Sequence, residues 1–403
     1  MRVLLLTNEY PPHIYGGAGV HVEYLSRELA KLTAVEVRSF HDQAFRAGQL
    51  VVQGYKVDSA LFSGCPKELL SPLRAFETCL RFNGQGIAAD VVHCHTWYAH
   101  FGGILARVLY GIPLVVTVHS LEPLRPWKQE QIGRGYDLSR WVEKTALEMA
   151  DAVVAVSKST RQDILRLFDI DAKKVQVIPN GVDTDEYKHS ADRAVLEKYG
   201  IDPSKPYVLF VGRMTRQKGL YYLLQALPKL EPSVQVVLCA GESDTPALQK
   251  ELEAMVKTLR TQRQGVVWIP EMVSRRTTIA LYSQAAVFCC PSIYEPFGII
   301  NLEAMACGTP VVGSKVGGIA EVVVDGMTGV LVDPKLSSTA PYDPVDPESF
   351  AILLAESLNR VVLDKELRTA MAIAGRQRVE ANYSWHSVAK QTLALYKNLS
   401  AQN

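Results

Sequence analysis

The sequence predicts two doubly wound α/β domains that follow one another along the chain. Its 403 residues exceed what one core usually organises. Short β-branched runs alternate with helical patterns, and this alternation restarts after a polar, turn-rich stretch at 183–206. Several runs are apolar throughout, as strands buried on both faces of a parallel sheet are. We expect domains at 1–185 and 186–383, with 384–403 as a C-terminal helix that can pack back on the first domain.

Seven runs of the first domain have strand character, and a helical repeat separates the first two. The repeat places Val22, Leu25 and Leu29 near the 3.6-residue period. The predicted strands are Val3–Thr7, Val35–Phe40, Val51–Val57, Val91–His95, Leu114–His119, Ala152–Val156 and Val175–Ile178. Such alternation implies a parallel sheet with right-handed crossovers.

Six runs predict a second sheet, with helices between them. They are Tyr207–Val211, Val234–Ala240, Val266–Ile269, Ala286–Cys290, Pro310–Gly313 and Gly329–Val332. The proline-rich segment 333–347 is expected to be a loop, and Asp346 and Pro347 are typical of a helix N-cap and first residue. Ligands of such sheets bind at the carboxyl ends of the strands, so we expect the site in a cleft between the domains.

Composition argues against several classes of protein. The 43 Lys and Arg balance the 42 Asp and Glu, whereas a nucleic-acid partner favours a basic excess. No run of 18 apolar residues predicts a membrane span, and the apolar run in Met1–Glu9 is too short for a signal peptide. The seven cysteines form no C-x-x-C pair. We expect a reduced, cytoplasmic protein without disulfides or a zinc site.

A glycine-rich loop joins the first predicted strand to the first helix, over Asn8–Gly19. Gly16 and Gly17 let backbone amides approach a ligand closely, and a helix N-terminus favours an anion. The loop does not match the G-x-G-x-x-G dinucleotide pattern. A ligand-binding loop and a helix-capping turn that binds nothing are both open interpretations.

The corresponding loop of the second domain, Gly212–Gly219, carries two cations. Arg213 leaves the end of a strand and Lys218 lies near the expected start of a helix. Together with the helix N-terminus they would neutralise a pyrophosphate as it departs. A solvated basic loop is the alternative.

Two glutamates eight residues apart flank a later strand-to-helix turn. Glu295 lies in the turn, and Glu303 follows in a helix that opens near Gly298. The free amides of Ile299 and Ile300 would face a ligand there. A carboxylate that accepts ribose hydroxyls is a common nucleotide-binding device. For Glu303 a helix-surface carboxylate is the alternative.

His95 and His119 each lie at the end of a predicted apolar strand, at the carboxyl edge of the sheet, where ligands of such folds bind. His93 and His95 form an H-x-H pair of the kind that metals use, but no matching set of further ligands follows. We therefore predict no metal, and a structural role for His93.

In this order, the clusters resemble the retaining glycosyltransferases of family 4, whose GT-B fold has two Rossmann-like domains. Glu295 and Glu303 have the spacing of the family's E-x7-E motif, which holds the donor sugar and ribose. The family's Arg and Lys that grip the donor diphosphate match Arg213 and Lys218, and its sugar-contacting histidine matches His119.

The resemblance covers nearly the whole chain and implies the site residues. The family's glycine-rich first loop matches residues 16–19. The implied catalytic residues are Glu295, His119, Arg213 and Lys218. The implied residues that bind the nucleotide sugar are Gly16, Gly17, Arg213, Lys218, Met272, Gly298, Ile299, Ile300 and Glu303. No metal or other cofactor is implied, and the acceptor attacks the face that the nucleotide leaves.

Residues 95–99 and 119–128 resemble the actinobacterial-type synthases of glycogen precursors. This resemblance implies ADP-glucose as donor, with glucose 1-phosphate or an α-glucan end as acceptor, giving maltose 1-phosphate or a longer glucan. Arg125, Lys128 and Arg134 would receive an acceptor phosphate, with a solvated loop as the alternative. The first loop departs from the K-x-G-G-L form of bacterial glycogen synthases, which argues against a purely polymer-extending role.

Three other functions share this fold. The first is a transferase that uses a UDP- or GDP-sugar on a lipid or small-molecule acceptor. With a membrane-lipid acceptor it would show a basic amphipathic patch, and residues 67–82 are the only candidate segment. An ordinary packed helix explains that segment better. A nucleotide-sugar epimerase would act without an acceptor, and a non-catalytic module would bind without releasing nucleotide.

Overall fold

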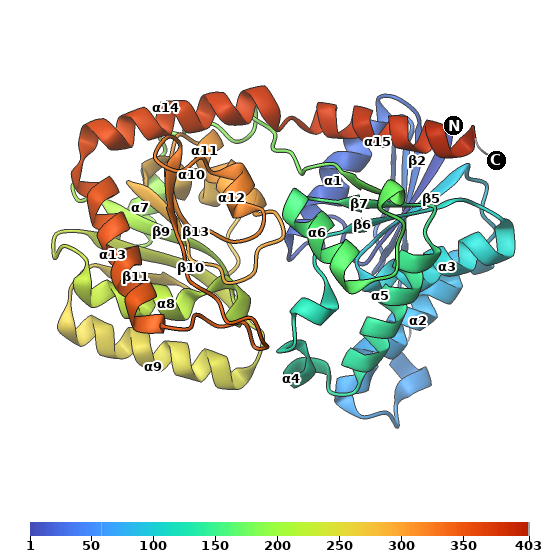
Figure 1. Cartoon of the computed structure of the whole chain (residues 1–403), viewed down its shortest axis with the longest axis horizontal. Helices are drawn as coiled ribbons and strands as arrows, with labels where there is room; N and C mark the ends of the chain where they lie inside the picture. The colour runs from blue at the N-terminus through green and yellow to red at the C-terminus, as the bar shows by residue number, and fades with distance from the viewer. Residues whose placement is uncertain (58, 402–403) are drawn as a thin grey trace. The chain divides into compact units, whose positions relative to one another are not determined.

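The computed structural model describes residues 1–57 and 59–401, which form two compact units (Figure 1). The first unit joins Met1–Gly181 to Trp385–Asn403, and the second is Val182–Ser384. The C-terminal helix, α15 (Trp385–Ser400), thus belongs to the first unit. Residue 58 of the expected first domain and residues 402–403 of the expected last segment lie outside the described residues.

The first unit contains an eight-stranded sheet in the order β3-β4-β2-β1-β5-β6-β7-β8. Its strands are β1 (Arg2–Thr7), β2 (Ala34–Phe40), β3 (Ala44–Ala47), β4 (Leu50–Tyr55), β5 (Val91–His95), β6 (Leu114–Val118), β7 (Ala152–Ala155) and β8 (Val175–Val177). All neighbours are parallel except the β3–β4 pair. The seven predicted strands are present. The sequence analysis missed β3 because all four of its residues are exposed and give no pattern of burial.

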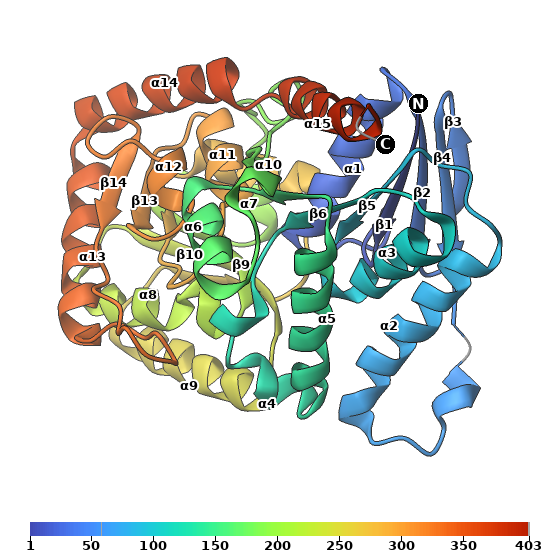
Figure 2. The ribbon, with the colours of Figure 1, turned by 45° about the vertical axis from the view of Figure 1, so that its right-hand side comes forward.

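Helices cover both faces of this sheet. They are α1 (Gly17–Ala30), α2 (Lys67–Gly84), α3 (Trp97–Tyr110), α4 (Lys128–Ile132), α5 (Gly135–Met149), α6 (Lys158–Leu167) and α15. α1 packs with α15, and α3 packs with α2 and α5 (Figure 2). On β1, Val3 and Leu5 belong to the core that α1 and α15 share, whereas Leu6 lies against Gly102 of α3. The alternation of side chains along β1 thus separates two helical layers.

The second unit has a six-stranded parallel sheet in the order β11-β10-β9-β12-β13-β14. Its strands are β9 (Tyr207–Met214), β10 (Gln235–Ser243), β11 (Val266–Ile269), β12 (Val287–Cys290), β13 (Val311–Ser314) and β14 (Gly329–Val332). Its helices are α7 (Ala194–Lys198), α8 (Leu220–Ala226), α9 (Pro246–Gln262), α10 (Arg275–Gln284), α11 (Ile299–Ala306), α12 (Ile319–Val322), α13 (Pro347–Leu363) and α14 (Lys365–Asn382). The predicted fold class, two doubly wound α/β domains, is confirmed.

The predicted start of α13 is confirmed, because Asp346 accepts a hydrogen bond from the amide of Ser349 at 3.0 Å and Pro347 is the first helical residue. The helix expected near Lys218 begins later. Residues 216–218 form a 3₁₀ turn, and α8 starts only after Gly219, whose φ of 66° breaks the helical geometry.

The lipid-surface interpretation of residues 67–82 loses its main support. α2 buries Ala75, Cys79 and Phe82 and packs along α3 and α5, as an ordinary globular helix does. Among the described residues, no helix combines the length and the apolar character needed to cross a membrane.

In each sheet the strand order reverses next to the first strand of the unit. β1 lies between β2 and β5, and β9 lies between β10 and β12, all parallel. Loops at such a reversal diverge to opposite faces and leave a crevice at the carboxyl ends of the strands. The predicted glycine-rich loop follows β1, Lys218 follows β9 and Glu295 follows β12, whereas His119 follows β6 and Met272 follows β11.

Candidate active site

In the second unit, the turns after β9 and β12 bring two of the predicted residues into contact. The ammonium nitrogen of Lys218 donates to Oε2 of Glu295 at 2.7 Å, and the hydroxyl of Ser292 reaches the same oxygen at 3.2 Å. The Glu295 side chain is 8% exposed and that of Lys218 is 22% exposed. A partly buried carboxylate and its counter-ion thus stand at the carboxyl edge of the sheet.

Close backbone contact holds these two turns together. The amide of Ile293 donates to the carbonyl of Gln217 at 2.9 Å. A Cβ on Gly219 would lie 2.0 Å from the carbonyl oxygen of Pro291, so that position has room only for glycine. The turn that carries Lys218 can therefore lie directly against the turn that carries Glu295.

A second set of glycines surrounds Glu295. A Cβ on Gly317 would lie 2.1 Å from the carbonyl oxygen of Glu295. Gly298 has a φ of 91°, and its Cβ would lie 2.4 Å from the side-chain nitrogen of Asn301. Gly298 also precedes the first residue of α11 without a side-chain cap. The N-terminus of α11 therefore carries no capping side chain beside Glu295.

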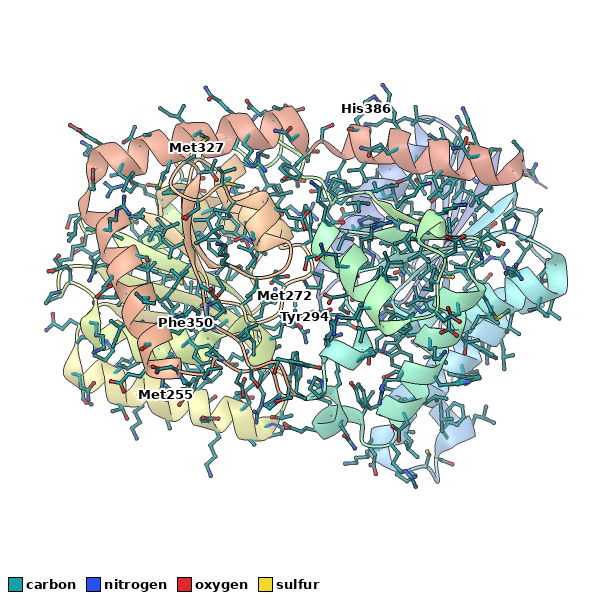
Figure 3. All side chains as sticks on the ribbon, viewed as in Figure 1. Met255, Met272, Tyr294, Met327, Phe350 and His386 are labelled. Carbon is teal, nitrogen blue, oxygen red and sulfur yellow. The ribbon has the colours of Figure 1, made fainter. Side chains whose placement is uncertain are left out.

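The predicted amides lie at this helix end. α11 begins at Ile299, so Ile299 and Ile300 are its first two residues, and the first amides of a helix have no partner within it. Their role in binding a phosphate stays a prediction. Met272, predicted to bind the nucleotide sugar, is 63% exposed in the segment after β11 (Figure 3).

Arg213, the other predicted cation, lies at the end of β9. One of its terminal nitrogens donates to Oδ1 of Asp244 at 3.2 Å, and its side chain is one-third exposed. The sequence analysis missed Asp244. The position of Asp244 directly after β10, the neighbour of β9 in the sheet, could have indicated that it lies near Arg213.

Glu303 is buried on α11 rather than exposed on the helix surface, so the surface alternative is wrong. It is 7% exposed, and the hydroxyl of Tyr282 donates to its Oε2 at 3.3 Å. Burial raises the pKa of Glu303, while hydrogen bonds from Tyr187 and Tyr282 act in the opposite direction. A buried carboxylate gains from further donors, and a pair of hydroxyl groups would supply them.

In the first unit, the glycine-rich loop already binds a carboxylate of the chain itself. Oε2 of Glu9 accepts the amides of Tyr15 at 3.1 Å and Gly16 at 2.9 Å, just before α1 begins at Gly17. A Cβ on Gly19 would lie 2.8 Å from Glu9, so the glycine permits this approach. For Gly16 the structure thus shows a capping contact, and the ligand role of Gly16 and Gly17 stays a prediction.

His119 lies directly after β6, beside His95 at the end of β5. Nδ1 of His95 and Nε2 of His119 are hydrogen-bonded at 3.1 Å. His21 of α1 is packed against both rings, and its Nδ1 donates to Oδ1 of Asn180 at 2.6 Å. Burial lowers the pKa of His119 well below its usual value, which keeps the ring neutral. A neutral imidazole suits the predicted contact with sugar hydroxyls.

His93 has the structural role that the sequence predicts. Its two ring nitrogens are hydrogen-bonded to the hydroxyl groups of Tyr396 and Thr117. Both contacts lie within the first unit, and one of them reaches α15.

Arg125 is 13% exposed, so it does not belong to a solvated loop. One terminal nitrogen donates to the hydroxyl of Ser120 at 3.1 Å and approaches Oε1 of Glu122 at 3.4 Å. Glu122 is itself buried, and Glu143 lies beside it with a pKa that burial raises. Lys128 is the first residue of the short helix α4, and Arg134 is the N-cap of α5.

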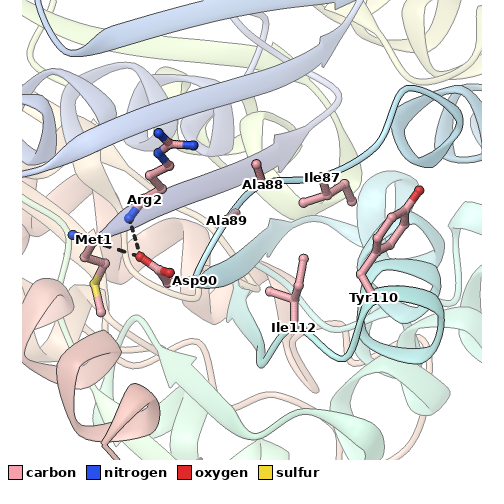
Figure 4. Close-up of a pocket in the computed structure, with 8 residues that line it drawn as sticks. All are labelled: Met1, Arg2, Ile87, Ala88, Ala89, Asp90, Tyr110 and Ile112. Atoms are coloured by element: carbon pink, nitrogen blue, oxygen red, sulfur yellow. Dashed lines mark hydrogen bonds and ion pairs between the residues drawn. The ribbon is translucent and has the colours of Figure 1, made fainter.

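A shallow pocket at the opposite edge of the first sheet has no link to these residues (Figure 4). There the amide of Arg2 donates to Asp90 at 2.6 Å, at the amino ends of β1 and β5. The lining residues are Met1, Arg2, Ile87, Ala88, Ala89, Asp90, Tyr110 and Ile112.

Two family models match the chain, one on each half. The model described as Glycosyltransferase Family 4 matches residues 15–186, and the model described as Glycosyl transferases group 1 matches residues 192–378. The chain therefore belongs to the glycosyltransferases of family 4, and its fold is GT-B.

Within this family the chain is similar to named synthases over its whole length. It is 46% identical to the alpha-maltose-1-phosphate synthase of Mycolicibacterium smegmatis, with 100% of both chains covered. It is 29% identical to a glycogen synthase of Mycobacterium tuberculosis, over 98% of this chain and 94% of that one. Among solved structures, the sucrose-phosphate synthase of Thermosynechococcus elongatus has a TM-score of 0.80 at 24% identity, covering 100% of both chains.

Proposed function

We propose that the chain transfers glucose from ADP-glucose to glucose 1-phosphate, forming maltose 1-phosphate and ADP with retention of the α configuration. The observation that carries this proposal is the Lys218–Glu295 ion pair at the carboxyl edge of the second sheet. It supports the proposal because Lys218 would serve as a cation for the departing diphosphate and Glu295, beside it, would hold sugar hydroxyls. The full-length similarity to alpha-maltose-1-phosphate synthase supports this choice of substrates.

The second unit would hold the donor. Arg213 and Lys218, with the amides of Ile299 and Ile300, would bind the diphosphate and stabilise the charge that develops on it. Glu303 would accept the two ribose hydroxyls. Met272 and Gly298 would complete the nucleotide contacts.

The sugar and acceptor contacts follow from the remaining residues. Glu295 would hold the glucose hydroxyls, and His119 would bind the glucose near its 6-hydroxyl. The bond from the anomeric carbon to the diphosphate oxygen breaks, and the acceptor oxygen forms the new bond on the same face. The departing diphosphate takes the acceptor proton. Arg125, Lys128 and Arg134 would bind the acceptor phosphate, and no metal or cofactor takes part.

Nucleotide release tests the proposal directly. ADP-glucose and UDP-glucose are each incubated with the chain and either glucose 1-phosphate, glycogen or no acceptor, and nucleotide and sugar products are separated. We expect ADP and maltose 1-phosphate only in the combination of ADP-glucose with glucose 1-phosphate. Preference for UDP-glucose, or sugar conversion without an acceptor, would overturn the assignment.

Extension of an α-glucan is the second candidate, because the chain is also similar to a glycogen synthase over nearly its whole length. Release of ADP with glycogen alone would favour it. If no combination releases nucleotide, lipid acceptors should be tested next.

A further inference from the structure

Three histidines from separate elements of the first unit converge on one point. His21 lies in α1, His95 ends β5 and His119 follows β6. One ring nitrogen of each lies within 4.8 Å of a ring nitrogen of both others. The H-x-H pair gave no hint of this set, because it contributes only His95, and His21 and His119 lie elsewhere in the sequence.

The three rings are neutral and therefore offer lone pairs. Burial lowers the pKa of His21 to about 4 and lowers the pKa of His95 and His119 well below the usual value. A neutral imidazole has one nitrogen that carries a proton and one that can bind a metal.

Asn180 fixes which nitrogen of His21 is available. Its carbonyl oxygen accepts the proton on Nδ1 at 2.6 Å, so the lone pair lies on Nε2. Among the described residues, this buried Nε2 has no hydrogen-bond partner. Nε2 of His95 also lacks one, but the ion would meet Nδ1 of that ring instead. Buried nitrogens without partners are unusual in folded proteins and call for an explanation.

We propose that His21, His95 and His119 form a binding site for one divalent transition-metal ion, with Zn²⁺ and Co²⁺ as suitable ions. Three imidazoles and one open position suit such an ion, because its preferred tetrahedral geometry accepts nitrogen ligands. His119 is only partly buried and gives the ion access. The inference does not depend on the proposed sugar transfer. It departs from the sequence-based prediction of no metal, and His119 would hold either the ion or the glucose.

The geometry requires little rearrangement. Ligand nitrogens in a tetrahedral site with bonds of about 2.0–2.1 Å are roughly 3.4 Å apart. Nδ1 of His95 and Nε2 of His119 are already 3.1 Å apart. If both nitrogens bind the ion, neither can keep the proton of this hydrogen bond. The ring that carries the proton must hold it on its other nitrogen. Where His95 carries that proton, its unpartnered Nε2 receives it.

Binding of Co²⁺ tests the site without any activity assay. The full chain, free of any affinity tag and treated with a chelator, is titrated with Co²⁺, and the visible absorption of a tetrahedral complex is followed. We expect one Co²⁺ per chain, displaced by an equal amount of Zn²⁺ but not by Mg²⁺, which prefers oxygen ligands. Absence of the absorption, or displacement by Mg²⁺, would overturn the proposal.

Variants locate the ion. His21→Gln is expected to abolish the absorption. The matched control is His13→Gln, because His13 and His41 form an exposed stacked pair near Asp42 that presents histidines on the surface. Loss of the absorption in His13→Gln, with binding intact in His21→Gln, would place the ion on the surface and reject the buried site.

Two substitutions at Asn180 keep the proposal testable if His21→Gln fails to fold. Asn180→Ala removes the acceptor that orients His21, and we expect an affinity for Co²⁺ lower by about 10- to 100-fold. Asn180→Asp restores an acceptor, so its affinity should equal or exceed that of the natural chain. Equal affinities in Asn180→Ala and the natural chain would show that His21 is not a ligand. Circular dichroism of each metal-free variant verifies its fold.

Discussion

The ammonium group of Lys218 lies 2.7 Å from a carboxylate oxygen of Glu295, across 77 positions of sequence. The contact joins the turn after β9 to the turn after β12, the two strands at which the order of the second sheet reverses. Because each residue is the counter-ion of the other, loss of either leaves a partly buried charge unpaired. Effects of substitutions at the two positions should therefore not add.

Replacement of either predicted cation tests its role in the departure of the diphosphate. Lys218→Ala and Arg213→Ala should each lower kcat by about 10²- to 10³-fold, because stabilisation of developing charge acts in the transition state. Steady-state kinetics with ADP-glucose would measure this. Arg216→Ala, an exposed position in the same loop, is the control and should leave kcat nearly unchanged. A change confined to KM would instead assign these cations to uniform binding.

Glu303 allows a test of ribose binding. Glu303→Gln keeps the size of the side chain and an acceptor for Tyr282 but removes the charge. Hydrogen bonds to charged groups contribute about 1.5–3 kcal/mol, so the KM for the nucleotide sugar should rise roughly 10- to 100-fold. Glu366→Gln, on the exposed surface of α14, is the control. An unchanged KM in Glu303→Gln would remove this residue from the nucleotide site.

A comparison of Gly219 with Gly200 distinguishes the cost of backbone strain from the cost of a steric clash. Gly219 and Gly200 have nearly equal φ values, 66° and 68°, but a Cβ meets the carbonyl of Pro291 at 2.0 Å in the first case and nothing within 4 Å in the second. Gly200→Ala should cost about 1–2 kcal/mol of folding free energy, the strain of the left-handed region alone. Gly219→Ala should cost clearly more. Urea unfolding of both variants would show the difference, and equal losses would contradict the close contact.

Buried histidines make the stability of the first unit sensitive to acid. The pKa of His21 is about 4 in the fold, against 6.5 for a free side chain. Between these values the unfolded chain binds more protons, so the free energy of unfolding falls as the pH drops from 6.5 to 4. At about 1.4 kcal/mol per pH unit, the loss from His21 amounts to roughly 3 kcal/mol.

Urea unfolding at several pH values, followed by tryptophan fluorescence, measures this slope. In His21→Gln the dependence between pH 6.5 and 4 should become shallower, because the titrating group is gone. His189→Gln, an exposed histidine of the second unit, should leave it unchanged. A slope that is the same in His21→Gln and the natural chain would assign the acid sensitivity to other groups.

Much of this architecture was predictable from sequence because buried strands and strand-end residues leave local patterns. Short β-branched runs, several of them apolar throughout, predicted thirteen strands. Lys218 and Glu295 each follow such a run, and the family resemblance assigned both to the donor. The short strand β3 escaped because exposed residues carry no pattern of burial. The sequence predicted a helix start near Lys218, whereas α8 begins after Gly219. The close approach of Gly219 to the carbonyl of Pro291 accompanies this break, and it is visible only in the fold.

Contacts between distant side chains were not predictable in the same way. Glu9 binds the amide of Gly16, and His21 joins His95 and His119, only because the fold brings these segments together. Asp244 had a usable signal, since it follows a predicted strand, but nothing local connects it to Arg213. Spacing along the chain therefore identified the edge of each sheet, while the partners of each side chain needed the fold itself.

The helix α15 returns to the first unit after the whole of the second has been made. Trp385 stacks on Tyr24 with ring centroids 5.6 Å apart, and Tyr396 is hydrogen-bonded to His93. On a ribosome, the nascent chain therefore starts the first unit, completes the second, and only then supplies the residues that close the first. The order of synthesis and the order of completion are reversed. Until α15 has been made, the apolar face that awaits Trp385 and its neighbours is exposed, and exposed apolar surface of this kind is what chaperones protect.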